Sequence, residues 1–141
     1  MKKVKAVLMG VCLTLTTAIA QADMVVIVSS KNPTDVVPQD VVKKIFLGKL
    51  KLFPDGRNAI PLDLPDESDG KEYFYQVTTN KNNAQLKSYW AKLIFTGAGA
   101  PSSSVNSQEE MVRLVAENPN TIGYVDKTLV DATVKVVWEV Q

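Results

Sequence analysis

The run Met24-Val-Val-Ile-Val28 decides the fold class of this chain. All of its residues are apolar and most are β-branched, with no polar residue alternating between them. This pattern is typical of a strand that is buried on both faces, as in a sheet covered by helices. The run ends at Ser29-Ser-Lys-Asn-Pro33, which predicts a loop.

Predicted helices and strands alternate downstream of this strand. Pro38 opens a helix expected over 38–47, because proline is tolerated in a first turn, and Gly48 ends it. The pattern of 59–64 predicts a short strand that stops at Pro65. Two further helices are expected over 71–78 and from a cap at Asn82 or Asn83 to 94. A loop over 96–106 follows them, and the capping pair Ser107 and Glu110 then begins a helix that reaches 115. Strands are expected over 121–125 and 134–140. This order predicts an α/β fold with a helix-covered mixed or mainly parallel sheet.

The first 22 residues have the layout of a cleavable secretory signal. Lysines cluster at the start, an apolar run follows over 6–20, and Ala20-Gln-Ala22 supplies the small-residue cleavage site. The apolar run is shorter than the ~20 residues that a membrane-spanning helix needs. We therefore expect a signal peptide over 1–22, a single domain over 23–141 and a periplasmic location.

The composition of the predicted domain excludes several classes of protein. The chain has no histidine, and its only cysteine, Cys12, would leave with the signal peptide. Zinc sites, cysteine nucleophiles and Ser-His-Asp triads are therefore not expected. Without 1–22 the chain has thirteen basic and fifteen acidic residues and a net charge of −2, which does not favour nucleic-acid binding. We expect a protein that is not an enzyme and has no metal or other cofactor.

Six short segments occur in a characteristic order along the predicted domain. They are Val25-Val-Ile-Val28, Asn32-Pro33, Val42-Lys-Lys-Ile-Phe-Leu-Gly48, Pro54-Asp-Gly56, Tyr89-Trp-Ala-Lys-Leu-Ile-Phe-Thr-Gly97 and Thr121-Ile-Gly-Tyr-Val125. In this order they resemble the periplasmic substrate-binding protein of phosphate ABC transporters. The resemblance covers most of 23–141. Full-length members of that family are two-lobed clamps of more than twice this length, so the chain resembles one lobe.

The resemblance also implies where a ligand would bind. The matching lobe of the family holds phosphate with an arginine and with Ser-Gly-Thr, which begins four residues later at the start of a helix. The corresponding positions here are Leu64, Ser68, Asp69 and Gly70. Ser68 keeps the hydroxyl, but the charge-assisted contact of the arginine is missing and Asp69 adds a carboxylate.

We consider Ser68, Asp69, Gly70 and Lys71 the main candidate ligand-binding residues. Lysine would restore positive charge, and backbone N–H groups at a helix N-terminus suit an anion. The alternative is a plain helix start, because serine caps and acidic residues in a first turn stabilise helices without a ligand. The acidic residues around this segment also raise a calcium hypothesis, but their spacing does not follow the twelve-residue calcium loop.

Two further groups of residues are open to two interpretations. Ser29 and Ser30 follow the first predicted strand, and open α/β sheets bind ligands beyond the carboxyl ends of their strands; the alternative is a polar turn. Four aromatic residues at helical spacing predict either a sugar or peptide groove or part of the core. They are Tyr73, Tyr75, Tyr89 and Trp90.

These observations lead to two hypotheses about function. The first is an exported, phosphate-type solute-binding domain with weak ligand binding or an accessory role in ABC-type anion uptake. Its partners would be a small anion such as phosphate and an ABC permease. The alternative is a periplasmic protein-interaction or sensor module that has lost phosphate binding and contacts an envelope protein.

Overall fold

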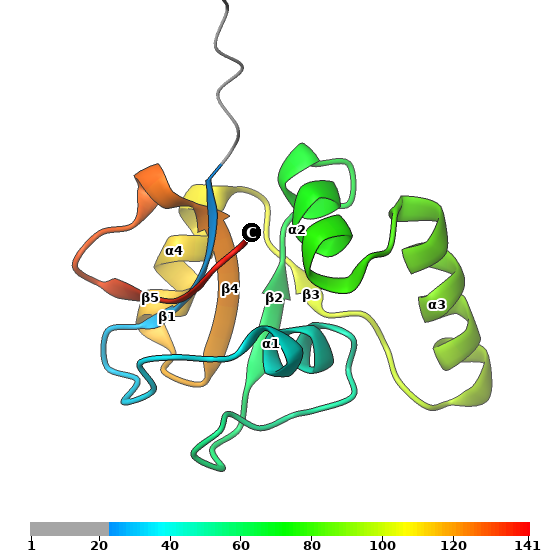
Figure 1. The fold of residues 1–141 in the computed structure, drawn as a ribbon, viewed down its shortest axis with the longest axis horizontal. Coiled ribbons are helices and arrows are strands. Elements are labelled where there is room, and N and C mark those ends of the chain that lie inside the picture. The colour runs from blue at the N-terminus through cyan, green and yellow to red at the C-terminus, as the bar shows by residue number, and fades with distance from the viewer. Residues whose placement is uncertain (1–22) are drawn as a thin grey trace, which may run out of the picture.

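The computed structural model describes residues 23–141, which share one hydrophobic core. The predicted signal peptide lies outside the described residues and stays a prediction. Helices and strands follow one another along the chain as shown in Figure 1. Their bounds are β1 (Met24–Ser29), α1 (Gln39–Phe46), β2 (Ile60–Asp63), α2 (Asp69–Thr79), α3 (Asn83–Thr96), β3 (Ser103–Ser104), α4 (Gln108–Glu117), β4 (Thr121–Asp126), the short 3-10 helix η1 (Lys127–Leu129) and β5 (Val134–Glu139).

The five strands form one mixed sheet in the order β3-β2-β4-β1-β5. Strand β2 pairs in parallel with both β3 and β4. Strand β1 pairs antiparallel with β4 and with β5, opposing Val26 to Tyr124 on one side and to Trp138 on the other. The predicted helix-covered mixed sheet is therefore confirmed.

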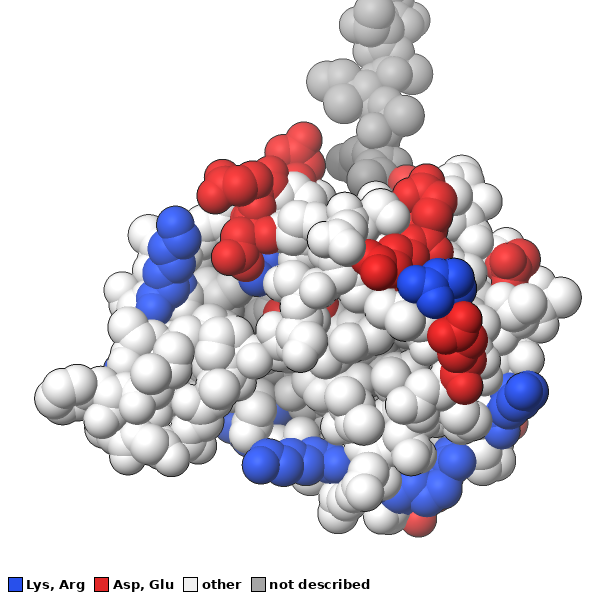
Figure 2. All heavy atoms as spheres, turned by 180° about the vertical axis from the view of Figure 1, so that it is seen from behind, with Lys and Arg blue, Asp and Glu red and all other residues white. Residues whose placement is uncertain are grey.

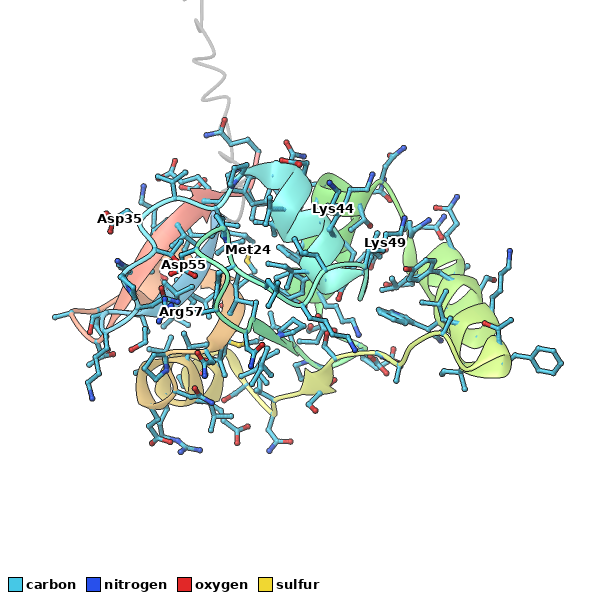
Figure 3. The ribbon with its side chains drawn as sticks, turned by 90° about the horizontal axis from the view of Figure 1, so that it is seen from below. Met24, Asp35, Lys44, Lys49, Asp55 and Arg57 are labelled. Carbon is cyan, nitrogen blue, oxygen red and sulfur yellow. The ribbon has the colours of Figure 1, made fainter. Side chains whose placement is uncertain are left out.

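Helices cover the two faces of this sheet. Helix α4 packs against β4 and β1 on one face, and α1 and α2 lie on the other (Figures 1 and 3). Every residue of β1 is buried, which explains its unbroken apolar sequence. On the α1 and α2 side, Phe74 stacks on Tyr124 with ring centroids 3.8 Å apart, and Phe46 meets both rings edge-on. This aromatic cluster joins α1, α2 and β4.

Helix α3 stands apart from the other elements, beyond the β3 edge of the sheet (Figure 1). Leu86 and Trp90 are its buried side chains, and the Tyr89 hydroxyl donates a 2.6 Å hydrogen bond to the Leu47 carbonyl after α1. A complete capping box formed by Asn82 and Gln85 begins the helix, and Gly97 ends it with a positive φ of 70°. Among the described residues, no helix is long and apolar enough to cross a membrane.

Candidate functional site

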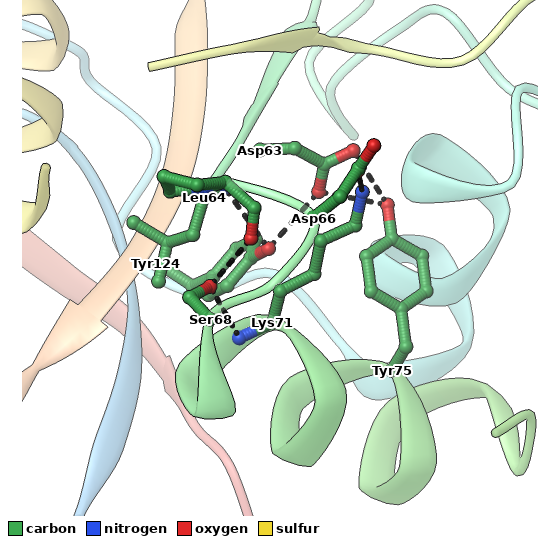
Figure 4. Close-up of polar contacts among 8 residues, drawn as sticks. Asp63, Leu64, Asp66, Ser68, Lys71, Tyr75 and Tyr124 are labelled. Carbon is green, nitrogen blue, oxygen red and sulfur yellow. Dashed lines mark hydrogen bonds and ion pairs between the residues drawn. The ribbon is translucent and has the colours of Figure 1, made fainter. Parts of the chain in front are cut away.

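The main candidate residues lie at the start of α2, where the chain leaves the carboxyl end of β2. Ser68 is the N-cap of α2: its hydroxyl accepts a 3.3 Å hydrogen bond from the Lys71 amide. The same hydroxyl donates to the Pro65 carbonyl at 2.7 Å. Ser68 therefore caps the helix, as expected from the alternative in which this segment is a helix start without a ligand. Both contacts of its hydroxyl lie within its own turn (Figure 4).

Gly70 is closely approached by apolar side chains. A Cβ atom added at Gly70 would lie 3.0 Å from the Leu64 Cδ1 atom and 3.6 Å from the Met24 Cε atom. Leu64 itself is only 1% exposed. The position that the resemblance assigns to an arginine thus holds a buried leucine, which fills the space beside the helix start with hydrocarbon. Asp69, the first helical residue, is exposed.

Lys71 is the basic residue of this site, and its charge is already matched. The residue is 8% exposed, and its Nζ atom lies 2.5 Å from the Asp66 Oδ1 atom. The hydrogen bond and the positive charge from Lys71 lower the pKa of Asp66. The ammonium group also lies 5.8 Å from the centre of the Tyr75 ring. Lys71 therefore serves an internal ion pair, so an anion at this site would compete with Asp66.

A buried carboxylate lies behind this ion pair. Asp63, 1% exposed at the end of β2, accepts hydrogen bonds from the Tyr75 hydroxyl at 2.9 Å and from the Tyr124 hydroxyl at 3.1 Å (Figure 4). The Tyr124 oxygen in turn accepts from the Leu64 amide at 3.2 Å. Burial raises the pKa of Asp63 to about 6, although Lys71 and both phenols act in the opposite direction. This network ties β2 to α2 and β4.

Sequence reasoning missed this network, which is the largest buried polar feature near the site. An aspartate between Leu62 and Leu64 in a predicted strand was a signal that a polar group would be buried there. Its partners are separated from it by 12 and 61 residues, so the sequence did not indicate them. Tyr75 and Trp90, two of the four aromatic groove candidates, are buried in the core, whereas Tyr73 is exposed.

Charge is distributed unevenly between the two ends of the sheet. The segment 63–72 at the start of α2 contains five acidic residues and one lysine. Acidic side chains predominate near the top of the face in Figure 2, and basic side chains near the bottom. The side seen from below in Figure 3 carries both Lys44, Lys49 and Arg57 and the acidic residues Asp35 and Asp55. The potential at the start of α2 therefore opposes an approaching anion.

Ser29 and Ser30 lie at the other end of the sheet, because β1 runs antiparallel to β4. Ser29 is buried, and its hydroxyl donates a 3.1 Å hydrogen bond to the Ala116 carbonyl and accepts from the Lys31 amide. Ser30 is exposed. The structure does not bring these serines together with Ser68, and their role in ligand binding stays a prediction. The carboxyl end of β1, which these serines follow, lies at the end of the sheet opposite to the carboxyl end of β2.

The acidic residues near the start of α2 are not gathered around one point. Between residues 23 and 141, no group of three or more Asp, Glu, His or Cys side chains is arranged to hold an ion. Asp63 faces two tyrosines, and Asp66 faces Lys71, so the acidic residues of the site point to different partners.

The fold defined by this sheet and its helices is that of one lobe of a phosphate-binding protein. A phosphate ABC transporter substrate-binding protein from Clostridium perfringens, solved with bound phosphate, superposes with a TM-score of 0.66 at 20% identity. An ABC-type phosphate transport receptor from Vibrio cholerae gives 0.65 at 17%, and PstS from Borrelia burgdorferi gives 0.62 at 13%. The predicted resemblance is thus confirmed at the level of the fold.

The extent of these similarities is limited. Each covers 82% of this chain but only 44%, 45% and 46% of the respective solved structures, so this chain spans less than half of their length. No protein-family profile and no curated protein matches the sequence.

Proposed function

We propose that this chain is an exported, single-lobe module that has lost phosphate binding and acts by contacting another envelope protein. The observation that carries the proposal is Leu64, buried beside Gly70 where the resemblance implies an anion-binding arginine. A buried hydrocarbon side chain offers no hydrogen bond to an oxyanion, whereas a guanidinium offers a bidentate one. The module keeps the architecture of a binding lobe, and its surface supplies its function.

The electrostatics of the site support the same proposal. The charge of Lys71 is matched by Asp66, and Asp69 adds an exposed carboxylate at the first position of α2. A phosphate dianion would have to displace the Asp66 carboxylate and approach that of Asp69.

Calorimetry of the purified protein with phosphate, sulfate and divalent cations tests the loss of ligand binding. We expect no binding heat at ~1 mM ligand, because Leu64 offers no hydrogen bond to an oxyanion and the charge of Lys71 is matched by Asp66. Saturable heat with phosphate at one site per chain would contradict the proposal.

Crosslinking in intact cells tests the contact with an envelope protein. We expect the Ser68→Ala variant, which loses a helix cap worth about 1 kcal/mol, to be crosslinked to the same partner as the unaltered protein. Loss of that crosslink in a folded Ser68→Ala protein would place function at the helix start and overturn the proposal.

A second candidate function is weak anion binding in ABC-type uptake, through Ser68, Asp69, Gly70 and Lys71. It is favoured by the position of α2, an eleven-residue helix whose N-terminus lies directly after the carboxyl end of β2. This candidate predicts that calorimetry detects heat of phosphate binding and that Ser68→Ala abolishes it. Asp69→Asn should increase the affinity for phosphate, because it removes a negative charge from the site. In intact cells, this candidate predicts that the protein is crosslinked to an ABC permease and not to another envelope protein.

A further inference from the structure

Phe95 is the most exposed large apolar residue in the described part of the chain. It is 93% exposed in the last turn of α3, next to Ile94, which is 57% exposed. Phenylalanine has no polar atom with which to compensate for contact with water. A fully exposed aromatic side chain beside a second apolar one is typical of a contact surface.

The same helix forms one wall of an open cavity. This cavity, of about 420 Å³, lies between α3, the turn before α2 and the segment 101–104. Leu86, Trp90 and Ile94 supply its apolar wall. Its charged lining consists of Asp66, Glu67, Lys71 and Lys87, and Lys71 is paired with Asp66. The cavity therefore offers apolar surface to an aromatic side chain, and Glu67 offers a carboxylate to a neighbouring cation.

The end of α3 carries a charge that complements Glu67 in this cavity. Lys92 lies one turn before Phe95, and α3 contains no acidic residue. Within residues 23–141, Lys92 and Glu67 are both exposed, and neither forms a salt bridge. An aromatic side chain preceded by a lysine thus matches an apolar cavity with a glutamate at its side.

We propose that two copies of this chain associate around a two-fold axis, with Phe95 of each copy inserted into the cavity beside α3 of the other. A closed, isologous dimer requires both complementary features to lie on one face of the chain. Ile94, which lines the cavity, is the direct neighbour of Phe95 in α3. The contact buries the exposed Phe95 and Ile94, and it brings Lys92 of one copy to Glu67 of the other. It also explains why α3 projects beyond the sheet edge.

Sedimentation equilibrium of the purified protein over a range of concentrations tests the proposal. The described residues 23–141 share one hydrophobic core, so the protein without residues 1–22 is suitable. We expect a monomer–dimer equilibrium, and we expect Phe95→Asp to raise the dissociation constant at least about thirtyfold, as for a central interface residue. The matched control is Val36→Asp, because Val36 is 69% exposed in the loop before α1.

A charge exchange makes the test specific to the proposed contact. Lys92→Glu and Glu67→Lys should each weaken the dimer, and the double variant should restore it, because the opposite charges again face each other. Circular dichroism checks that each variant is folded. A wild-type protein that is monomeric up to ~1 mM overturns the proposal. So does a dimer that Phe95→Asp leaves intact, or a double variant weaker than both single ones.

Discussion

Asp63 is a buried acid whose charge changes in the weakly acidic range. Desolvation raises the pKa of its carboxyl group to about 6, whereas an aspartate in the unfolded chain titrates near 3.9. Between these values the folded protein holds a proton that the unfolded chain has released. Stability therefore falls as the pH rises from about 4 to about 6, and it changes little through this group above that range.

Replacing Asp63 with asparagine should remove this pH dependence. The rise in pKa corresponds to about 3 kcal/mol of stability lost between low pH and neutrality. Urea unfolding of the wild-type protein at several pH values from 4 to 7 should show this decline, and Asp63→Asn should show a nearly flat profile. The matched control is Asp69→Asn, an exposed position at the start of α2, which should keep the wild-type profile. A decline that persists in Asp63→Asn would assign the titration to another group.

At the scale of elements, helix α4 approaches β4 closely at Gly123. A Cβ atom added there would lie 2.4 Å from the Met111 Sδ atom and 3.2 Å from the Val115 Cγ2 atom. Met111 and Val115 are fully buried, so neither side chain has free space into which to move. A strand glycine at such a place permits close packing of a helix on the sheet.

Gly123→Ala should therefore destabilise the protein by about 2 to 3 kcal/mol, the cost of overpacking a core. The free energy of unfolding in urea measures this change. A double-mutant cycle with Met111→Ala gives the control, because truncating Met111 removes the sulfur that the new methyl group would meet. The double variant should lose less stability than the sum of the single variants. Strict additivity would contradict the steric explanation.

Several elements were predictable because their residues carry local signals. Pro38 and Gly48 bracket α1, Asn82 caps α3, and Ser107 caps α4. The cap of α4 differs from the expected capping pair in one hydrogen bond. The Glu110 carboxylate accepts from the backbone amide of Asn106, whereas a capping box would use the amide of Ser107.

Other features depend on pairing between distant segments. Strand β3 has only two residues in a stretch rich in Gly, Pro and Ser, so no periodic pattern marks it. The antiparallel direction of β1 is also invisible to periodicity, because a doubly buried strand is apolar in either direction. Within the candidate site, the cap formed by Ser68 was predictable, whereas Leu64, Asp63 and Lys71 acquire their surroundings only in the folded chain.

At the scale of the whole molecule, the attachment of α3 is the weakest part of the fold. Helix α3 is held to the rest of the domain by two buried side chains, Leu86 and Trp90, and by the hydrogen bond from the Tyr89 hydroxyl to the Leu47 carbonyl. Elements with few buried apolar contacts open more readily than central strands. In dilute protein, amide hydrogens of α3 should exchange with solvent faster than those of β1 and β4.

Tyr89→Phe should increase the difference in amide exchange rate between α3 and the strands β1 and β4. Losing a hydrogen bond worth about 1 kcal/mol should speed exchange in α3 by about fivefold and leave β1 unchanged. Hydrogen–deuterium exchange read by mass spectrometry measures both regions in one experiment. Equal acceleration in β1 would show that α3 opens only when the whole domain unfolds.

The position of β1 between β4 and β5 has a consequence for the order of folding. Met24–Ser29 is paired on both sides with strands that lie about one hundred residues further along the chain. Contacts of this kind close large loops, so they form late and slow the folding reaction. A nascent chain cannot complete the pairing of β1 until residues 121–139 have been synthesised. Until then β1 lacks both of its neighbours in the sheet, and the final strand closes the sheet.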